Sequence, residues 1–195
     1  MHITSYRDNI LETSRQLIEH MIVNHNKVLT VRIDIRFPSS YPHNGMNDEI
    51  EQFNKNIARC FRYRNVDMRY IDVREQNYSY HPHYHALIIV DGNKIQNPYT
   101  ILEVATRTWN GIVGSDTLGL VHLCTHQEGH PIPPMEMIRR PSSLATGAQL
   151  EQQTAAFERA RRIALDHTAY LAKEFTKGNA PEGVREMLAS QIRRS

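Results

Sequence analysis

The sequence has 195 residues and a mass of 22.6 kDa, and its 23 lysines and arginines against 21 acidic residues give a formal charge of +2. Apolar residues make up 40% and charged residues 23%, which excludes a collagen-like, low-complexity or wholly disordered chain. No apolar run reaches the roughly 18–20 residues that span a bilayer, and the polar N-terminus has no signal-peptide core. Two cysteines are too few for a disulfide framework, so we expect a cytoplasmic protein without a membrane segment.

The first half of the chain predicts two helices and three strands. Residues 10–23 carry apolar side chains at helical spacing, and the period then changes to alternation over residues 28–37. There every odd position from Leu29 to Phe37 is apolar and four of the five even positions are polar, the pattern of a strand buried on one face. We expect a helix next, starting at Asn47 or Asp48 and ending near residue 61, then strands over residues 68–75 and 84–90.

The second half predicts a helix over 101–113, a strand over 118–124, a proline-rich loop over 125–147 and a long helix over 149–177. The tail holds at most one weak helix. After the first helix the order is β-α-β-β-α-β, which right-handed crossovers fold into a four-stranded antiparallel sheet backed by two helices. We therefore expect an α+β protein of the ferredoxin-like, RRM-like type. The expected parts are an N-terminal helix over 1–26, a main domain over 27–178 and a tail over 179–195.

Two histidines at the start of the strand 84–90 are the sharpest chemical feature. Alternate residues of a strand share a face, so His83 and His85 point the same way, about 7 Å apart along the backbone. Two imidazoles at that spacing can hold one metal ion, whereas the plainer interpretation is a pair of surface histidines on an edge strand. His81 lies beyond Pro82 and flanks the pair. Because the strand is otherwise apolar, we favour metal binding.

A divalent ion needs a further protein ligand besides two histidines. Glu75 ends the preceding predicted strand, and it would lie near the histidines if the two strands are neighbours. Two histidines and one carboxylate with open positions suit a catalytic metal. Taken alone, Glu75 is equally consistent with a solvated strand end, and Asp72 and Asp34 are weaker candidates.

The final predicted helix carries a second candidate group. Tyr170 and Lys173 are separated by three residues and share a helix face, which Lys177 continues one turn later. Nearby positive charge favours the phenolate, and tyrosine can act as a covalent nucleophile. A tyrosine that packs on the sheet with its hydroxyl at the rim is the plainer alternative.

Arginines gather in three groups. Five lie between Arg59 and Arg74 with aromatic residues among them, and two further groups are Arg139–Arg140 and Arg159–Arg162. Such interleaving is compatible with a nucleic-acid surface and also with a solvated helix face.

The order of these motifs carries a family resemblance. An alternating strand, paired histidines on a later strand and Tyr-x-x-Lys on a late helix resemble the three motifs of HUH replication initiators. The closest resemblance, over residues 28–177, is to the YagK/YfjJ-type inovirus replication proteins of filamentous phages, prophages and related mobile elements. The segments that carry it are Arg74-Glu75, residues 82–89, residues 119–122 and residues 170–177.

The resemblance implies a metal-dependent HUH nuclease. His83, His85 and Glu75 would hold a divalent ion, Mg²⁺ or Mn²⁺, and Tyr170 would be the nucleophile, with Lys173 one helical turn away. The expected activity is site-specific nicking and joining of single-stranded DNA through a 5′-phosphotyrosyl bond, at an origin hairpin that starts rolling-circle-type replication. No second tyrosine follows Tyr170 in its helix, which argues against a two-tyrosine mechanism.

The expected activity also requires residues that bind the DNA backbone and host proteins that act after the nick. We expect four basic side chains to contact the DNA: Arg74, Lys177, Arg159 and Arg162. The sequence has no Gly-x-x-x-x-Gly-Lys-Ser/Thr loop, so a host helicase and polymerase would have to follow the nick.

Three alternatives stay open. The first is a DNA-binding regulator that derives from such a replication protein and does not cleave. The second is an iron oxygenase with a 2-His-1-carboxylate site, although that class normally has a double-sheet barrel with more strands than this chain predicts. The third is a structural or partner-binding protein with incidental histidines.

Overall fold

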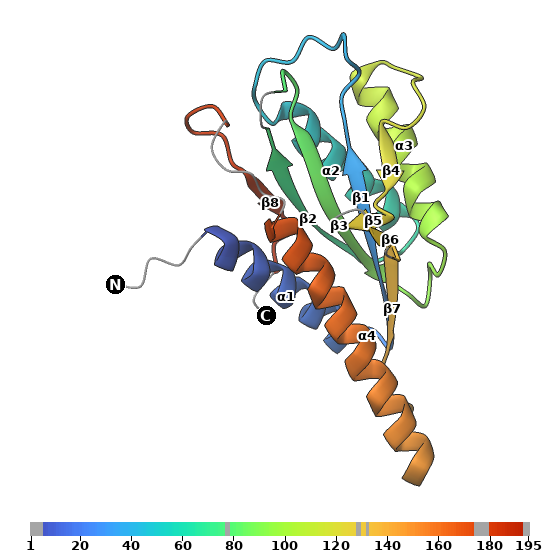
Figure 1. Cartoon of the computed structure of the whole chain (residues 1–195). Helices are drawn as coiled ribbons and strands as arrows, with labels where there is room; N and C mark the ends of the chain where they lie inside the picture. Colours follow the sequence, from blue (N-terminus) through green and yellow to red (C-terminus); the bar gives the residue numbers. More distant parts are fainter. Residues whose placement is uncertain (1–5, 77–78, 128–129, 132, 174–179, 193–195) are drawn as a thin grey trace.

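The computed structural model describes residues 6–76, 79–127, 130–131, 133–173 and 180–192 (Figure 1). This part of the chain forms an α+β fold with four helices, a six-stranded antiparallel sheet and a small two-stranded sheet. The helices are α1 (Tyr6–Asn24), α2 (Asp48–Tyr63), α3 (Pro98–Val113) and α4 (Gly147–Lys173). The strands are β1 (Lys27–Ile35), β2 (Met68–Glu75), β3 (His83–Asp91), β4 (Val121–Leu123), β5 (His126–Gln127), β6 (His130–Pro131), β7 (Met135–Arg139) and β8 (Met187–Ala189).

The main sheet has the strand order β4-β1-β3-β2-β8, and β7 also pairs with β1. Every pairing in it is antiparallel. The register aligns Asp34 with His85 across β1 and β3, and Glu75 with His83 across β2 and β3. Partners in an antiparallel pair point to the same face, so this register brings all four side chains together at one end of the sheet.

The main sheet has six strands in the described residues, whereas the sequence predicted four. The four expected strands are present, but β7 adds beside the first half of β1 and β8 adds outside β2. β7 lies inside the segment expected to be a loop, and β8 lies in the tail expected to hold at most a helix. Both are short, at five and three residues, and both form because β1 and β2 offer them unpaired backbone groups. The two-stranded sheet of β5 and β6 was also unexpected.

Helices cover both faces of the main sheet (Figure 1). On the α2/α3 face, helices α2 and α3 pack on the odd-numbered residues of β1, from Leu29 to Ile35, and on Tyr84, Ala86 and Ile88 of β3. On the opposite face, the α1/α4 face, helices α1 and α4 pack on Leu87 and Ile89. β1 is therefore covered on both sides, and the expectation that only one side is buried is wrong.

The α2/α3 face is an apolar core built from two amphipathic helices. In α2 the buried residues Ile50, Phe53, Ile57 and Phe61 recur at intervals of three and four, as one face of a helix requires. Trp109 of α3 is fully buried, and its ring meets that of Phe53 edge-on at a centroid distance of 5.9 Å. Each such buried aromatic contributes roughly 1.5–3 kcal/mol from apolar burial. α3 begins at an Asn97 cap and ends at Gly114, whose φ of 62° favours glycine.

Helix α4 lies against both the sheet and α1 on the α1/α4 face. Small buried residues, Ala160 and Ala164, let its backbone approach closely, and Leu171 is 1% exposed. The Arg161 guanidinium donates to the Glu19 carboxylate at 2.6 Å and ties α4 to α1. α1 is thus an integral layer of the fold. Of the helices in the described residues, none combines the length and the apolar character that crossing a bilayer requires.

Candidate metal centre

The polar group at the end of the α1/α4 face comes from the three central strands of the sheet. β3 supplies His83 and His85, β1 supplies Asp34, and β2 supplies Glu75. The alternation along each strand directs their neighbours, Ile33, Tyr84 and Arg74, to the α2/α3 face. The side chains expected from the sequence to act together, His83, His85 and Glu75, are therefore neighbours in space, and Asp34 joins them.

His85 lies between two carboxylates. Its Nδ1 is 2.7 Å from Oδ1 of Asp34, and its Nε2 is 2.7 Å from Oε2 of Glu75. The same Glu75 oxygen is 4.0 Å from Nδ1 of His83, and the two imidazole rings have centroids 4.3 Å apart. His85 is 4% exposed and held on both sides, so its ring orientation is fixed by the register of the three strands.

The residues present fit a metal ion. Asp34, His83 and His85 each offer a ligand atom, and these atoms lie within 4.8 Å of one another. Nε2 of His83 is buried and has no hydrogen-bond partner in the described part of the chain. An unsatisfied buried nitrogen is costly, and a metal ion would give it a partner. The group of one aspartate and two histidines could therefore hold a metal ion.

The protonation states suit ligands. Burial, and then the electrostatic effect of His85, lower the pKa of His83 to about 4, so this imidazole is neutral near neutral pH and keeps a free lone pair. Burial by itself would raise the pKa of Asp34. Hydrogen bonds from His122 and His85 outweigh burial and hold that pKa well below its usual range, so Asp34 is an anion.

His122 also belongs to this group, although the sequence motifs predict no role for it. It lies on β4 opposite Asp34, and its Nε2 is 3.3 Å from Oδ2 of Asp34. Asp34 thus has one oxygen on His85 and the other on His122. His122 ends the segment 119–122 that carries the family resemblance, and this was the available signal for it, but only the pairing of β4 with β1 reveals its contact with Asp34.

Helix α4 runs toward this group. Two turns after Arg159 the helix buries His167, whose pKa is lowered to about 4 by burial and then by the positive charge of Arg32 of β1. Arg32 precedes Asp34 by two positions on the same face of β1. The electrostatic effect of Arg32 on His167 is consistent with the second half of α4 lying on the same face of the sheet as Asp34.

The predicted nucleophile lies in the last turn of α4. Tyr170 and Lys173 follow His167 by three and six residues in α4, or roughly 5 and 9 Å along the axis. Leu171, between them, is buried against the α1/α4 face. The side chains of Tyr170 and Lys173 are outside the described part, and Lys177 falls wholly outside the described residues.

Arg74 is not placed to contact DNA. It is 2% exposed and points to the α2/α3 face, away from the histidines. The expectation that it binds the DNA backbone does not fit this burial, because its guanidinium is used inside the protein. It donates to the carbonyl oxygens of Gly45 and Met46 and to the side chains of Asn47, Gln76 and Tyr84. The two arginines predicted on α4, Arg159 and Arg162, are exposed, and their contact with DNA stays a prediction.

These features define a class: an α+β protein whose central strands carry an aspartate–histidine group on the sheet face that the long helix α4 packs against. The profile of the family described as the YagK/YfjJ C-terminal domain matches residues 2–184, nearly the whole chain. The chain belongs to this family, which confirms the resemblance to the YagK/YfjJ type. Membership is compatible with a phage- or prophage-derived protein. No curated protein and no solved structure matches the chain.

Proposed function

We propose that this protein is a metal-dependent nuclease of the HUH type, which nicks and rejoins single-stranded DNA through Tyr170. The observation that carries the proposal is the position of the histidine pair. His83 and His85 lie on the central strand, beside carboxylates from both neighbouring strands, on the face that α4 covers. The strand order β4-β1-β3-β2, with α2 and α3 as connections, supports the ferredoxin-like arrangement that this class requires.

Within this proposal, His83, His85 and Glu75 hold the metal ion and Asp34 orients His85. An imidazole gives one nitrogen to a metal and uses the other for a hydrogen bond. Both Asp34 oxygens already contact histidines, which suits an outer residue that fixes the ring. Oε2 of Glu75 faces the other nitrogen of His85 and is also near His83, which suits a ligand. Direct ligation by Asp34 is the other geometry that the group allows.

The chemistry assigned to Tyr170 is a phosphoryl transfer. The phenolate oxygen bonds to the phosphorus, the bond from phosphorus to the 3′-oxygen breaks, and that oxygen takes up a proton to give a free 3′-hydroxyl. A bound divalent ion would polarise the phosphate and offset its developing charge. The ammonium of Lys173, one turn along the helix, favours the phenolate. Because the phosphotyrosyl bond keeps the phosphodiester energy, a 3′-hydroxyl can later reverse the step and join strands.

The proposed partners follow from this chemistry. Single-stranded DNA, at an origin hairpin, is the substrate, and the exposed Arg159 and Arg162, with Lys177, contact its backbone. The ion used in the cell is Mg²⁺ or Mn²⁺. A host polymerase would extend the free 3′-hydroxyl while a host helicase unwinds the duplex, in rolling-circle-type replication of a phage or mobile element.

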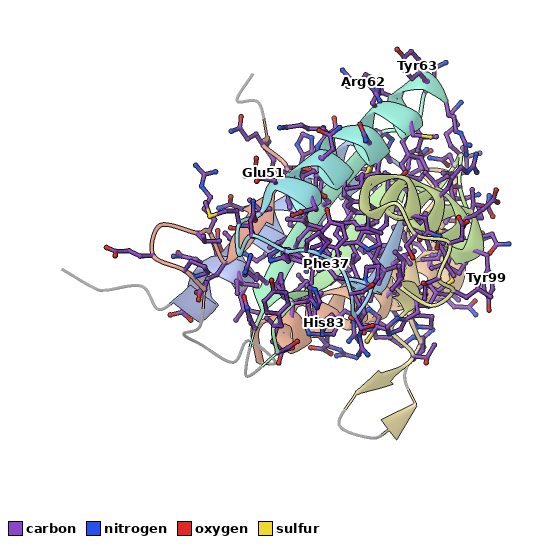
Figure 2. All side chains as sticks on the ribbon, turned by 90° about the horizontal axis from the view of Figure 1, so that it is seen from above. Phe37, Glu51, Arg62, Tyr63, His83 and Tyr99 are labelled. Atoms are coloured by element: carbon purple, nitrogen blue, oxygen red, sulfur yellow. The ribbon has the colours of Figure 1, made fainter. Side chains whose placement is uncertain are left out.

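A covalent-capture assay tests the proposal. The full chain is mixed with a random-core pool of single-stranded DNA in Mn²⁺ or in EDTA, and a denaturing gel reports any protein–DNA adduct. Tyr170→Phe is the test variant, and Tyr99→Phe is the matched control, because Tyr99 is 65% exposed on α3 and lies far from His83 (Figure 2). We expect a Mn²⁺-dependent adduct in the wild type and in Tyr99→Phe, and none in Tyr170→Phe.

Two results would overturn the nuclease proposal. An adduct of equal yield in Tyr170→Phe would exclude Tyr170 as the nucleophile. The absence of any adduct, with salt-sensitive DNA binding intact, would identify a DNA-binding regulator that does not cleave.

A further inference from the structure

A cavity of about 310 Å³ lies at the end of the sheet, next to the candidate metal centre. Glu75 and His83 form part of its lining, and Arg36, Phe37, Gln76 and His81 form most of the rest. The cavity is thus continuous with the metal centre and brings groups to it that the proposed reaction has not used. Its volume is in the range of small-ligand sites.

Among the described residues that line the cavity, Arg36 supplies the basic side chain, and its positive charge is available to bind an anion. It follows Asp34 by two positions, so the alternation of β1 continues onto it and directs it to the side of the metal centre. Its side chain is exposed and makes no hydrogen bond or ion pair with the residues that the structure describes.

The other two arginines near this end of the sheet are used differently. Arg74 and Arg32 are 2% and 1% exposed, and Arg74 donates to several groups of the protein. Arg74 holds Gln76 of the cavity wall through a 2.6 Å hydrogen bond to its side-chain oxygen. Arg74 therefore shapes the cavity, whereas Arg36 can bind something that enters it.

The rest of the lining suits a nucleotide. The rings of Phe37 and His81 are stacked with centroids 5.7 Å apart, and the ring of Tyr80 packs edge-on against His81 at 4.9 Å. Tyr80 is 69% exposed, so an aromatic face is available at the border of the cavity. Aromatic faces stack on bases without strong sequence preference, and a guanidinium matches phosphate oxygens in geometry and charge.

We propose that this cavity is a nucleotide subsite, in which Arg36 binds a phosphate of the DNA strand beside His83 and Glu75, and the rings of Tyr80 and His81, backed by the buried ring of Phe37, contact the adjoining sugar and base. This inference rests on the proposed function and deepens it, because it assigns a phosphate-binding residue to the nuclease centre. The free guanidinium offsets the negative charge of the phosphate that Glu75 alone would repel.

Binding of thymidine 3′,5′-bisphosphate, measured by calorimetry in Mn²⁺, tests the subsite. Arg36→Ala and Arg36→Lys are the test variants. Arg62→Ala is the matched control, because Arg62 is also exposed but lies near the opposite end of α2 from Phe37 and His83 (Figure 2). We expect Arg36→Ala to weaken binding about tenfold or more, Arg36→Lys to weaken it less, and Arg62→Ala to change it less than about twofold.

A titration of each variant with Mn²⁺ alone separates phosphate binding from damage to the centre. Arg36→Ala should keep the wild-type Mn²⁺ affinity within about twofold, since Arg36 is not a ligand. Equal effects of Arg36→Ala and Arg62→Ala, or no binding by the wild type, would overturn the subsite. If the probe binds through Arg36 but no Tyr170 adduct forms, the nuclease proposal fails and the subsite stands. If the adduct forms and Arg36→Ala binds normally, the subsite alone fails.

Discussion

Two buried aspartates lie on opposite faces of the same sheet, and their surroundings give them opposite properties. Asp34, on the α1/α4 face, is 8% exposed and contacts two histidines, which hold its pKa well below the usual range. Asp72, on the α2/α3 face, is 1% exposed and accepts a hydrogen bond from the neutral amide of Asn54. Burial raises the pKa of Asp72 to about 7 despite that hydrogen bond.

The difference shows that the two faces have different tasks. The α2/α3 face is an apolar core in which a carboxyl group keeps its proton up to about pH 7 and serves the fold. The α1/α4 face keeps a carboxylate charged by surrounding it with imidazoles, at the cost of burying polar groups under a helix. A stable fold does not require such an arrangement, whereas a metal centre does. Changes on one face should therefore affect stability, and changes on the other should affect ligand binding.

The largest effect on stability is expected on the apolar face. Trp109→Ala removes a fully buried ring that contacts Phe53, so it should lower the free energy of unfolding by about 3–5 kcal/mol. Urea denaturation measures this decrease. In the folded protein the Mn²⁺ affinity should stay within about twofold of the wild type, because Trp109 lies on the face away from the histidines. A parallel loss of Mn²⁺ affinity would show that the two faces are not independent.

Asp72→Asn should change how stability depends on pH. The folded protein keeps the Asp72 proton up to about pH 7, whereas an ordinary aspartate loses it near 3.8. Between these values the unfolded chain binds fewer protons, so the Asp72 contribution to stability is full at low pH and falls as pH rises to 7. The variant lacks this loss. Its free energy of unfolding should therefore rise relative to that of the wild type between pH 4 and pH 7, by at most about 4 kcal/mol.

Denaturation of Asp72→Asn and the wild type at pH 4.5 and pH 7.5 measures that gain. An equal difference between the two proteins at both pH values would show that Asp72 is ionised normally in the fold.

Asp34→Asn should weaken Mn²⁺ binding about 10–100-fold, the usual effect of losing a carboxylate that orients a ligating histidine. Glu75→Gln should weaken it at least as much if Glu75 is a direct ligand. Asp72→Asn is the matched control, since it makes the same chemical change in a buried aspartate of the other face. Calorimetric titration with Mn²⁺ ranks the three variants by affinity. A wild-type affinity in Asp34→Asn would show that Asp34 is not part of the metal centre.

The smallest effect is expected from the exposed arginines of α4. Replacing Arg159 and Arg162 by alanine should weaken single-stranded DNA binding a few-fold and reduce the slope of its salt dependence, by about 0.7 for each phosphate that is no longer neutralised. Arg161→Ala is the control, because Arg161 is engaged with Glu19 and Glu158. Fluorescence anisotropy at several salt concentrations measures both quantities. The same salt dependence in the double variant and the wild type would exclude these two side chains as phosphate ligands.

Local patterns predicted much of this molecule. The alternation from Leu29 to Phe37, the spacing of His83 and His85 and the extent of β2 all follow from residues that are neighbours in the chain. The approach of Glu75 to the histidines was predicted on the condition that β2 and β3 pair, and they do. These features depend on the alternation of residues along a strand and on the short connection between β2 and β3. Both can be recognised in a single sequence.

The remaining features depend on contacts between distant segments. β7 and β8 are strands only because β1 and β2 pair with them. The polar positions of β1 were expected to face water, but they are buried on the α1/α4 face, and this turned a weak candidate, Asp34, into a central one. Arg74 looked like a surface cation because charge on an alternating strand usually faces outward, whereas its partners come from residues 45–47, 76 and 84.

The central claim is that the buried polar group on the α1/α4 face is a metal site, and a Mn²⁺ titration of the full chain near pH 7.5 tests it most directly. We predict one ion per chain for the wild type and for Asp72→Asn, and no measurable binding for the double variant His83→Ala/His85→Ala. Circular dichroism would verify that the double variant is folded. Wild-type stoichiometry and affinity in that folded variant, or no binding by the wild type, would contradict the account.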